Sequence, residues 1–284
     1  MTLTSEHKVD DCVGGIYEDI KATLRVSIVP LPFRLWSQNP PLLELLWSRL
    51  RSNLETRYIE CAADRIRKQA AQMVSNHRVA HRIDADEISL FTIQKSRVVI
   101  DIHHYINPKL LLIVTSLVKT LQRDTFNPIT DPRFSLSIPK GIPTEMPTIP
   151  LLEKLWLSHD KRRVLKEIQK ALALPKISTE YLGLAYCGGY LERAWAELKS
   201  FTRTNTYSEL TEHLQLLART LVHGLPFSLN IGWDEFTSIG MSGLEVLNRI
   251  MPLQNALPGL ILHMAALKVG MDGVEKASQS PYPI

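Results

Sequence analysis

One carboxylate stands alone in an apolar stretch of the second half of the chain. In KISTEYLGLAYCGGY (176–190), Glu180 is surrounded by apolar and neutral residues, and the run breaks at Gly188–Gly189. A carboxylate in apolar surroundings can act as a general base. Glu180 also follows Ser178 and Thr179, either of which can cap a helix, and carboxylates are favoured in a first helical turn. On physical grounds alone, a helix start is the favoured interpretation of Glu180.

Asn107 and the pair His103–His104 are the other polar candidates. Asn107 precedes Pro108, which predicts a helix boundary with Asn107 as the N-cap of the next helix. The functional alternative is an amide that holds a water or a substrate oxygen. Adjacent helical residues point about 100° apart, so at most one of the two histidines can face a given cleft. A core or surface histidine is the simpler interpretation of each.

Several catalytic and ligand-binding motifs are missing from the sequence. There is no GxSxG elbow, since GMSG (240–243) lacks the spacing, and there is no phosphate-binding glycine loop. His77 and His81 have the i, i+4 spacing of metal ligands, but the acid of HExxH is missing and arginines flank them. We therefore expect surface histidines, no metal site and no cofactor.

Composition limits the compartment and the partners. The chain has 284 residues, of which 45% are hydrophobic and 22% charged, and its net charge of +4 is spread among acids. Such a chain can bury a core, and it lacks the concentrated basic face of nucleic-acid-binding proteins. Three scattered cysteines indicate a reducing compartment. The polar N-terminus and the longest apolar run, 110–118, predict neither a secretory signal nor a membrane span. We expect a cytoplasmic protein whose partner is a small-molecule substrate, with a homodimer as a possibility.

Helical periodicity runs through most of the chain, as in YEDIKATLRV (17–26). The exception is 123–150, which contains six of the 17 prolines. Because proline fixes φ and removes a donor, we expect this connector to be extended and not helical. Within it, FSLSIP (134–139) is the main candidate for strand-like alternation.

The two flanking halves resemble each other. Sliding the chain by 148 residues, and by 150 near the end, superposes apolar positions, a tryptophan and helix breakers in one order. The matched pairs include Trp47 with Trp195, Pro40–Pro41 with Gly188–Gly189, and Pro108 with Pro258. We therefore predict an all-α fold of two tandem helical repeats, 1–122 and 151–284, joined by the Pro-rich connector 123–150. The repeats are expected to form an intramolecular pseudo-dimer with a ligand cleft between them.

The repeat also places the candidate residues. Glu180 falls on Pro32, so both halves should start a short helix there, which Pro40–Pro41 or Gly188–Gly189 then ends. Asn107 falls on Leu257. Each polar residue thus exists in one half only, which favours a single asymmetric site.

Five segments carry a family resemblance that spans nearly the whole chain. The chain resembles the group I 2-haloacid dehalogenases in YEDIKATLRV (17–26), INPKLLLIVTSL (106–117), SIPKGIP (137–143), LARTLVHGLP (217–226) and the ending MDGVEKASQSPYPI (271–284). The resemblance implies an all-helical pseudo-dimer that hydrolyses 2-haloalkanoic acids. A carboxylate at a helix start in the second repeat would activate a water, which an asparagine of the NPK segment helps to hold. The water would attack Cα directly, with inversion, no enzyme ester and no metal or organic cofactor.

By this resemblance the asparagine is Asn107 and the base is Glu180, where the family pattern has aspartate. Glutamate has similar basicity, but its extra methylene moves the oxygens by about an ångström. We expect the substrate pocket to include Ile28 and Leu31, where the family has aromatic residues, and His104, where an asparagine is expected. Three further pocket residues are expected around the base: Thr179, Tyr181 and Tyr186.

Two other functions remain open at this point. The same scaffold with a more aliphatic pocket could host an isomerase, lyase or cyclase step, with Glu180 or His104 as the acid/base. A non-catalytic helical binding protein, in which Glu180 is only a cap, is the third hypothesis.

Overall fold

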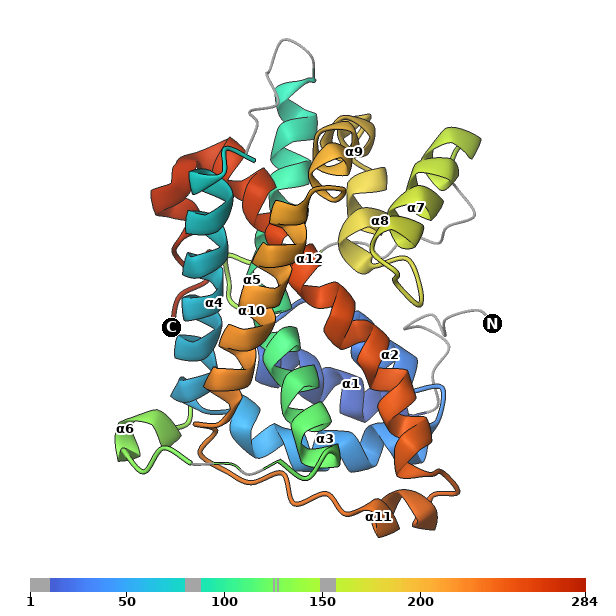
Figure 1. Ribbon diagram of the computed structural model, residues 1–284, viewed down its shortest axis with the longest axis vertical. Coiled ribbons are helices and arrows are strands. Elements are labelled where there is room, and N and C mark those ends of the chain that lie inside the picture. Colours follow the sequence, from blue (N-terminus) through green and yellow to red (C-terminus); the bar gives the residue numbers. More distant parts are fainter. Residues whose placement is uncertain (1–10, 80–87, 125, 127, 149–156) are drawn as a thin grey trace.

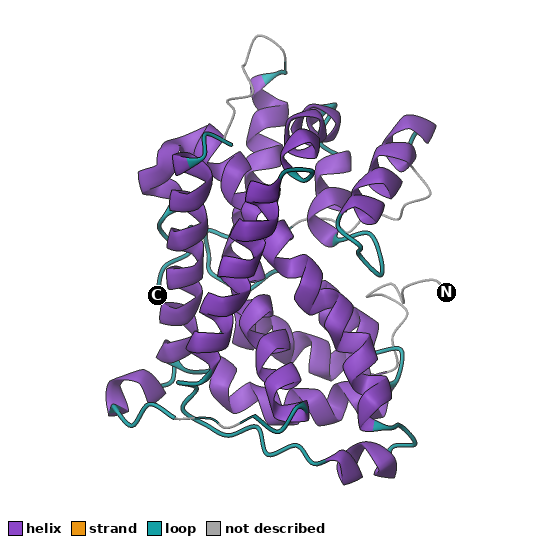
Figure 2. Cartoon of the chain, in the orientation of Figure 1, coloured by secondary structure: helices purple, strands orange, loops and turns teal. Residues whose placement is uncertain are grey.

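The computed structural model describes residues 11–79, 88–124, 126, 128–148 and 157–284. Within these residues the chain consists of helices joined by loops, without a strand (Figure 2). The helices are α1 (Asp11–Leu24), α2 (Leu31–Trp36), α3 (Pro40–Leu54), α4 (Arg57–Asn76), α5 (Leu90–Leu121), α6 (Pro132–Ser135), α7 (His159–Ala171), α8 (Thr179–Ala185), α9 (Tyr190–Phe201), α10 (Asn205–Val222), α11 (Trp233–Ser238) and α12 (Gly243–Ala277). The all-α prediction is confirmed.

Four long helices, α4, α5, α10 and α12, form the centre of the molecule, and α5 packs most extensively on α12 (Figure 1). Helices α1–α3 lie at the lower end of this group in Figure 1, and α7–α9 gather at its upper end. Among the described helices, α12 alone is long and apolar enough to cross a membrane. Since 83% of its apolar window is buried inside the protein, α12 has the surroundings of a core helix.

The helices of the two halves start in register. Helix α7 begins 148 residues after α1, α8 begins 148 residues after α2, and α10 begins 148 residues after α4. Contacts within each half also correspond: α1 packs on α3 as α7 packs on α9, α2 on α3 as α8 on α9, and α4 on α5 as α10 on α12. This register agrees with the shift that predicts two repeats. The pseudo-dimer and the domain boundaries themselves stay predictions.

The connector contains one turn of helix, so the prediction that it is not helical is wrong at α6. Pro132 is the first residue of α6, a position where a missing N–H costs nothing. The side chain of Asp131 accepts a hydrogen bond from the backbone N–H of Arg133 and starts the turn. The alternating segment 134–139 forms no strand; it contributes an isolated bridge between Thr56 and Ser137.

The predicted helix boundary at Asn107 is also wrong, because α5 continues through Pro108. Pro108 has no N–H, so the carbonyl of His104, four residues earlier, loses its helical donor. Arg67 of α4 supplies the replacement. Its Nε donates to the His104 carbonyl and its Nη2 to the Tyr105 carbonyl, each at 3.1 Å. Arg67 is completely buried, so its guanidinium stabilises α5 at the proline from within the core.

A buried ion pair lies next to this contact. The Lys109 ammonium donates to Glu60 of α4 and, at 3.2 Å, to the Leu24 carbonyl at the end of α1. It also lies 3.8 Å from the ring centre of Tyr105, whose hydroxyl donates to the same Glu60 carboxylate. Burial lowers the pKa of Lys109 to about 8, against the opposing effect of Glu60. These contacts fix α5 to both α4 and α1.

Two neutral histidines are buried in the core. Nε2 of His104 lies 2.8 Å from the carbonyl of Ala277, near the end of the chain. His263 of α12 accepts a hydrogen bond at Nδ1 from the hydroxyl of Tyr181. Burial lowers the pKa of each histidine to about 3, and the cation of Arg67 lowers that of His104 further. Both histidines are therefore neutral in the folded protein at neutral pH.

We predict that Arg67→Met lowers the free energy of unfolding by about 3 kcal/mol or more, because two hydrogen bonds from a charged donor are lost and two carbonyls are left unpaired. Urea unfolding measures the change. Arg65→Met, an exposed position on the same helix, is the control and should change stability by less than about 0.5 kcal/mol. Pro108→Ala restores a helical N–H, so it should cost less in the Arg67→Met background than in the wild type. Equal costs in both backgrounds would contradict this role of Arg67.

We also predict loss of stability in mild acid. The unfolded chain protonates its histidines near pH 6.5, whereas the folded chain keeps His104 and His263 neutral down to about pH 3. The unfolded state therefore binds more protons between these values, and stability falls as the pH is lowered from 6.5. The slope approaches about 1.4 kcal/mol per pH unit for each histidine.

Urea unfolding between pH 7.5 and pH 5 tests this prediction, with His263→Asn and His104→Gln each expected to make the slope shallower. The exposed His213→Asn is the control. A slope that neither core variant changes would show that these histidines do not cause the acid sensitivity.

Candidate active site

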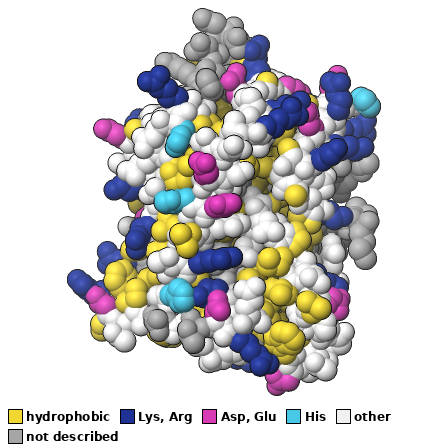
Figure 3. Space-filling view, in the orientation of Figure 1, with side chains coloured by type: hydrophobic (Ala, Val, Ile, Leu, Met, Phe, Trp, Pro, Cys, Tyr) yellow, Lys and Arg dark blue, Asp and Glu magenta, His cyan; other side chains and the backbone are white. Residues whose placement is uncertain are grey.

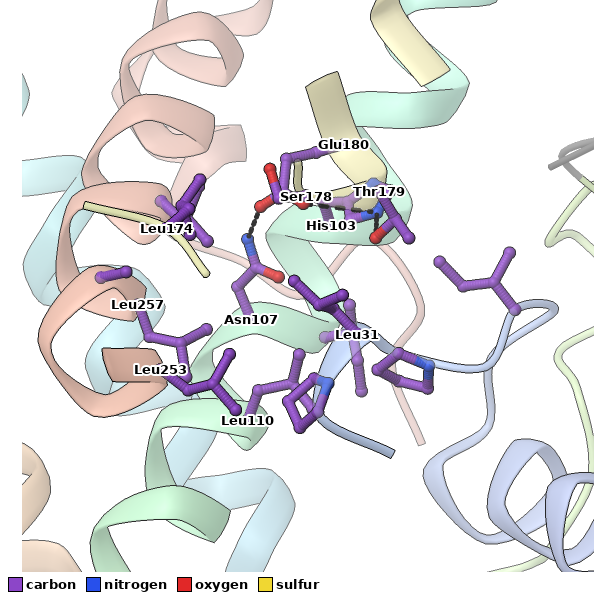
Figure 4. A pocket seen from close by; sticks show the side chains of 16 residues that line it. Leu31, His103, Asn107, Leu110, Leu174, Ser178, Thr179, Glu180, Leu253 and Leu257 are labelled. Atoms are coloured by element: carbon purple, nitrogen blue, oxygen red, sulfur yellow. Dashed lines mark hydrogen bonds and ion pairs between the residues drawn. The ribbon is translucent and has the colours of Figure 1, made fainter. Parts of the chain in front are cut away.

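A pocket lies where the starts of α2 and α8 approach α5 and α12 (Figure 4). It encloses about 390 Å³, including its opening to solvent. Its lining residues are Ile28, Pro30, Leu31, Pro32, His103, Ile106, Asn107, Leu110, Leu174, Ser178, Thr179, Glu180, Leu253, Ala256, Leu257 and Leu260.

The lining residues pair between the two halves of the chain. Under the shifts of 148 and 150 residues the pairs are Pro30/Ser178, Leu31/Thr179, Pro32/Glu180, His103/Leu253, Ile106/Ala256, Asn107/Leu257 and Leu110/Leu260. Five of these pairs join a polar residue to an apolar one. All five polar members lie on α5 or at the start of α8, whereas their partners lie on α12 or at the start of α2. The pocket therefore has a polar side and an apolar side.

The polar side is centred on Glu180 and Asn107. Glu180 is the second residue of α8, and the helix starts at Thr179 as predicted. Nδ2 of Asn107 donates to Oε1 of Glu180 at 3.1 Å, and each side chain is only 2% exposed. Since an ionised carboxylate only accepts, the amide must turn its NH₂ group to Glu180. Its carbonyl oxygen then remains available as an acceptor in the pocket.

His103 lies beside this pair. Nε2 of His103 is 2.9 Å from the hydroxyl of Thr179 and 3.9 Å from Oε2 of Glu180. Nδ1 of the ring is 2.8 Å from the carbonyl of Val99, one helical turn back on α5. Figure 4 shows His103, Thr179, Glu180 and Asn107 together on one side of the pocket, across from Leu31 and Leu253.

The structure brings five of the eight sequence-predicted site residues into this pocket. These are Ile28, Leu31, Asn107, Thr179 and Glu180. Residues that are far apart in the sequence thus meet as the repeat and the resemblance predicted.

The other three predicted residues lie elsewhere. His104 points away from the pocket, because its ring is held at the Ala277 carbonyl and the next helical position turns about 100°. Tyr181 is buried behind α8, where its hydroxyl contacts His263 of α12. Tyr186 is the C-cap of α8 and is not among the lining residues, although burial raises its pKa. These three predictions are corrected.

Sequence reasoning missed His103 and Ser178. His103 precedes Asn107 by four residues, so the two share one face of a helix, and this spacing could have selected His103 over His104. Ser178 was considered only as a cap, but its side chain makes no capping hydrogen bond. Its hydroxyl is buried and has no hydrogen-bond partner within the described residues.

The described part of the chain contains no cluster of three or more histidine, cysteine, aspartate or glutamate side chains that could hold a metal ion. His77 ends α4 as its C-cap and is exposed, whereas His81 lies outside the described residues. On the face shown in Figure 3, lysines and arginines are interspersed with acidic side chains.

Comparisons with known proteins agree with one another. Residues 27–181 match the family described as halocarboxylic acid dehydrogenase DehI. The chain is 30% identical, over 99% of its length and 97% of the relative's, to a configuration-inverting 2-haloacid dehalogenase of Alcaligenes xylosoxydans xylosoxydans. It is 27% identical, over 93% of its length and 90% of the relative's, to an (R)-2-haloacid dehalogenase of Pseudomonas putida.

A solved structure of D-2-haloacid dehalogenase in complex with L-LA superposes with a TM-score of 0.86 at 25% identity, covering 98% of this chain and 96% of that one. A mutant of D-2-haloacid dehalogenase with D-2-CPA gives a TM-score of 0.85 over 94% of each chain, also at 25% identity. The chain belongs to the group I 2-haloacid dehalogenase family, hydrolases that act on carbon–halide bonds.

Proposed function

We propose that this protein hydrolyses the carbon–halide bond of small 2-halocarboxylic acids, with Glu180 as the base that activates water. The observation that carries the proposal is the buried carboxylate of Glu180, which faces the pocket and is held there by the Asn107 amide at 3.1 Å. A buried carboxylate without a cationic partner within 4 Å, other than the titratable His103, is expensive unless it has a function.

The two side chains offer a water both of the acceptors it needs. One water hydrogen can bond to Glu180, and the other to the free carbonyl oxygen of Asn107. A lone pair of the oxygen then points into the pocket, towards Cα of a bound substrate. Attack forms the O–Cα bond, expels the halide with its bonding electrons and moves one proton to Glu180. In-line displacement inverts the configuration at Cα.

The two sides of the pocket suggest how the substrate binds. The Ser178 hydroxyl, buried and without a partner among the described residues, can donate to the substrate carboxylate. The alkyl group then lies against the apolar side, which includes Leu31, Leu253 and Leu257. This arrangement favours substrates with a small aliphatic chain.

Glutamate in place of the family's aspartate changes the contact with the asparagine. The longer side chain of Glu180 reaches Asn107 directly, so the amide orients the base as well as the water. The proposal uses no metal and no organic cofactor, since proton transfer and displacement need only these side chains. We infer that the pocket is the single polar site of a duplicated fold, in which Pro32 and Leu257 occupy the matching positions.

We predict that Glu180→Gln lowers kcat for halide release from 2-chloropropanoate by about 100- to 10,000-fold, because the amide cannot accept the proton of water. The control is Glu209→Gln, an exposed carboxylate on α10. Halide is measured over a panel of chloro- and bromo-acids of increasing chain length.

The panel also separates the alternatives. If no haloacid releases halide, the dehalogenase proposal fails, and other acid/base chemistry in the same pocket, or ligand binding without turnover, takes its place. If Glu180→Gln turns over like the wild type, Glu180 is not the base.

We further predict that Leu31→Phe shifts the substrate preference to shorter acids, because the larger ring occupies space on the apolar side of the pocket. The ratio of kcat/KM for 2-chlorobutanoate to that for chloroacetate should fall by about 10-fold or more, the usual effect of one or two methylenes in an apolar site. Leu216→Phe, at an exposed leucine on α10, is the matched control. An unchanged ratio would show that the alkyl group binds elsewhere.

A further inference from the structure

The second carboxylate oxygen of Glu180 faces a histidine. Asn107 donates to Oε1, whereas Oε2 lies 3.9 Å from Nε2 of His103. His103 and Glu180 are both 2% exposed. The pocket therefore holds a base and a second proton acceptor side by side, and the displacement step uses only the first.

The contacts of His103 determine which ring nitrogen is free. The Val99 carbonyl only accepts, so Nδ1, 2.8 Å away, carries a hydrogen in both charge states of the ring. In the neutral ring Nε2 is then unprotonated and accepts from the hydroxyl of Thr179 at 2.9 Å. The nitrogen nearest to Glu180 is thus the basic one, as a proton acceptor requires.

We propose that His103 takes from Glu180 the proton that the attacking water loses, and so restores the base within the closed pocket. The proposal rests on the proposed function, since it concerns the fate of the proton after displacement. The established family chemistry requires a base; the assignment of its proton acceptor comes from this geometry.

The surroundings leave His103 as the acceptor. Among the described residues, no ionisable side chain other than His103 lies within 4 Å of the Glu180 carboxylate as an ion-pair partner. Helix α12 faces the site with Leu253, Ala256 and Leu257, and the start of α2 faces it with prolines and Leu31. Helix α8 contributes Thr179 beside Glu180 itself.

The proton balance has three steps. First, water gives its oxygen to Cα, the halide leaves with the bonding electron pair, and one proton moves to Glu180. Second, that proton passes to Nε2 of His103, and the Thr179 hydroxyl rotates to accept from the new N–H. Third, the imidazolium releases the proton to solvent as product leaves. The net products are the hydroxy acid, halide and one proton, and both side chains return to their starting states.

The test is His103→Gln, followed by rapid-mixing measurement of halide from 2-chloropropanoate. We expect one rapid equivalent of halide per active site, since Glu180 can accept one proton, and then a steady rate about 100-fold below wild type. Added imidazole should restore part of the steady rate and leave the rapid phase unchanged. Thr179→Val should slow the steady phase less, by about 10-fold. His213→Gln, an exposed histidine on α10, is the control and should match wild type.

Two results overturn the proposal. One is a His103→Gln enzyme with a steady rate within about 3-fold of wild type. The other is an equal fall of the first turnover and the steady rate, insensitive to imidazole, which indicates a structural role. If His103→Gln does not fold, as judged by circular dichroism, His103→Asn and Thr179→Val are judged by the same two phases. Failure of the proposed function is distinct, because Glu180→Gln would then still give a rapid phase.

Discussion

The hydrogen bond between Asn107 and Glu180 is the interaction on which the site depends. It joins the middle of α5 to the start of α8, two elements 73 residues apart in the sequence, across the interface of the two halves. A short helix of seven residues cannot place a catalytic oxygen by itself. The amide from the long core helix provides the fixed point, and the helix start keeps the carboxylate near its favoured end of the dipole. Capping geometry and catalysis are therefore compatible at Glu180.

The fixed point has its own support. Asn107 stands directly before Pro108, where an α-helix normally loses a hydrogen bond and bends. Arg67 pairs with the carbonyls that the proline leaves short of donors, and the ion pair of Lys109 with Glu60 joins the next turn to α4. The buried polar groups on the far side of α5 thus hold the turn whose near side carries Asn107 and His103. A duplicated scaffold supplies the walls, and its polar residues on one side only give the pocket a direction.

Much of this could be predicted from the sequence, and the failures have physical causes. Helical periodicity gave the fold class, and the internal shift placed Glu180 at a helix start and Asn107 at the pocket. The helix break expected at Pro108 did not occur, because the compensating donor, Arg67, comes from another helix and is invisible to local rules. His104 was chosen over His103 because the resemblance pointed there, whereas the i, i+4 relation to Asn107 selects His103. Tyr181 and Tyr186 were placed by proximity in sequence to the base, but α8 turns both away from the pocket.

The most direct test of the account is a single-turnover reaction in H₂¹⁸O with excess enzyme over 2-chloropropanoate, analysed by mass spectrometry of the product and of the peptide that contains Glu180. Attack by a water that Glu180 activates predicts one ¹⁸O atom in the hydroxyl group of the product and none in the peptide. Unlabelled product from the first turnover, with ¹⁸O entering the Glu180 carboxylate, would show that Glu180 attacks the substrate itself and would contradict its role as the base.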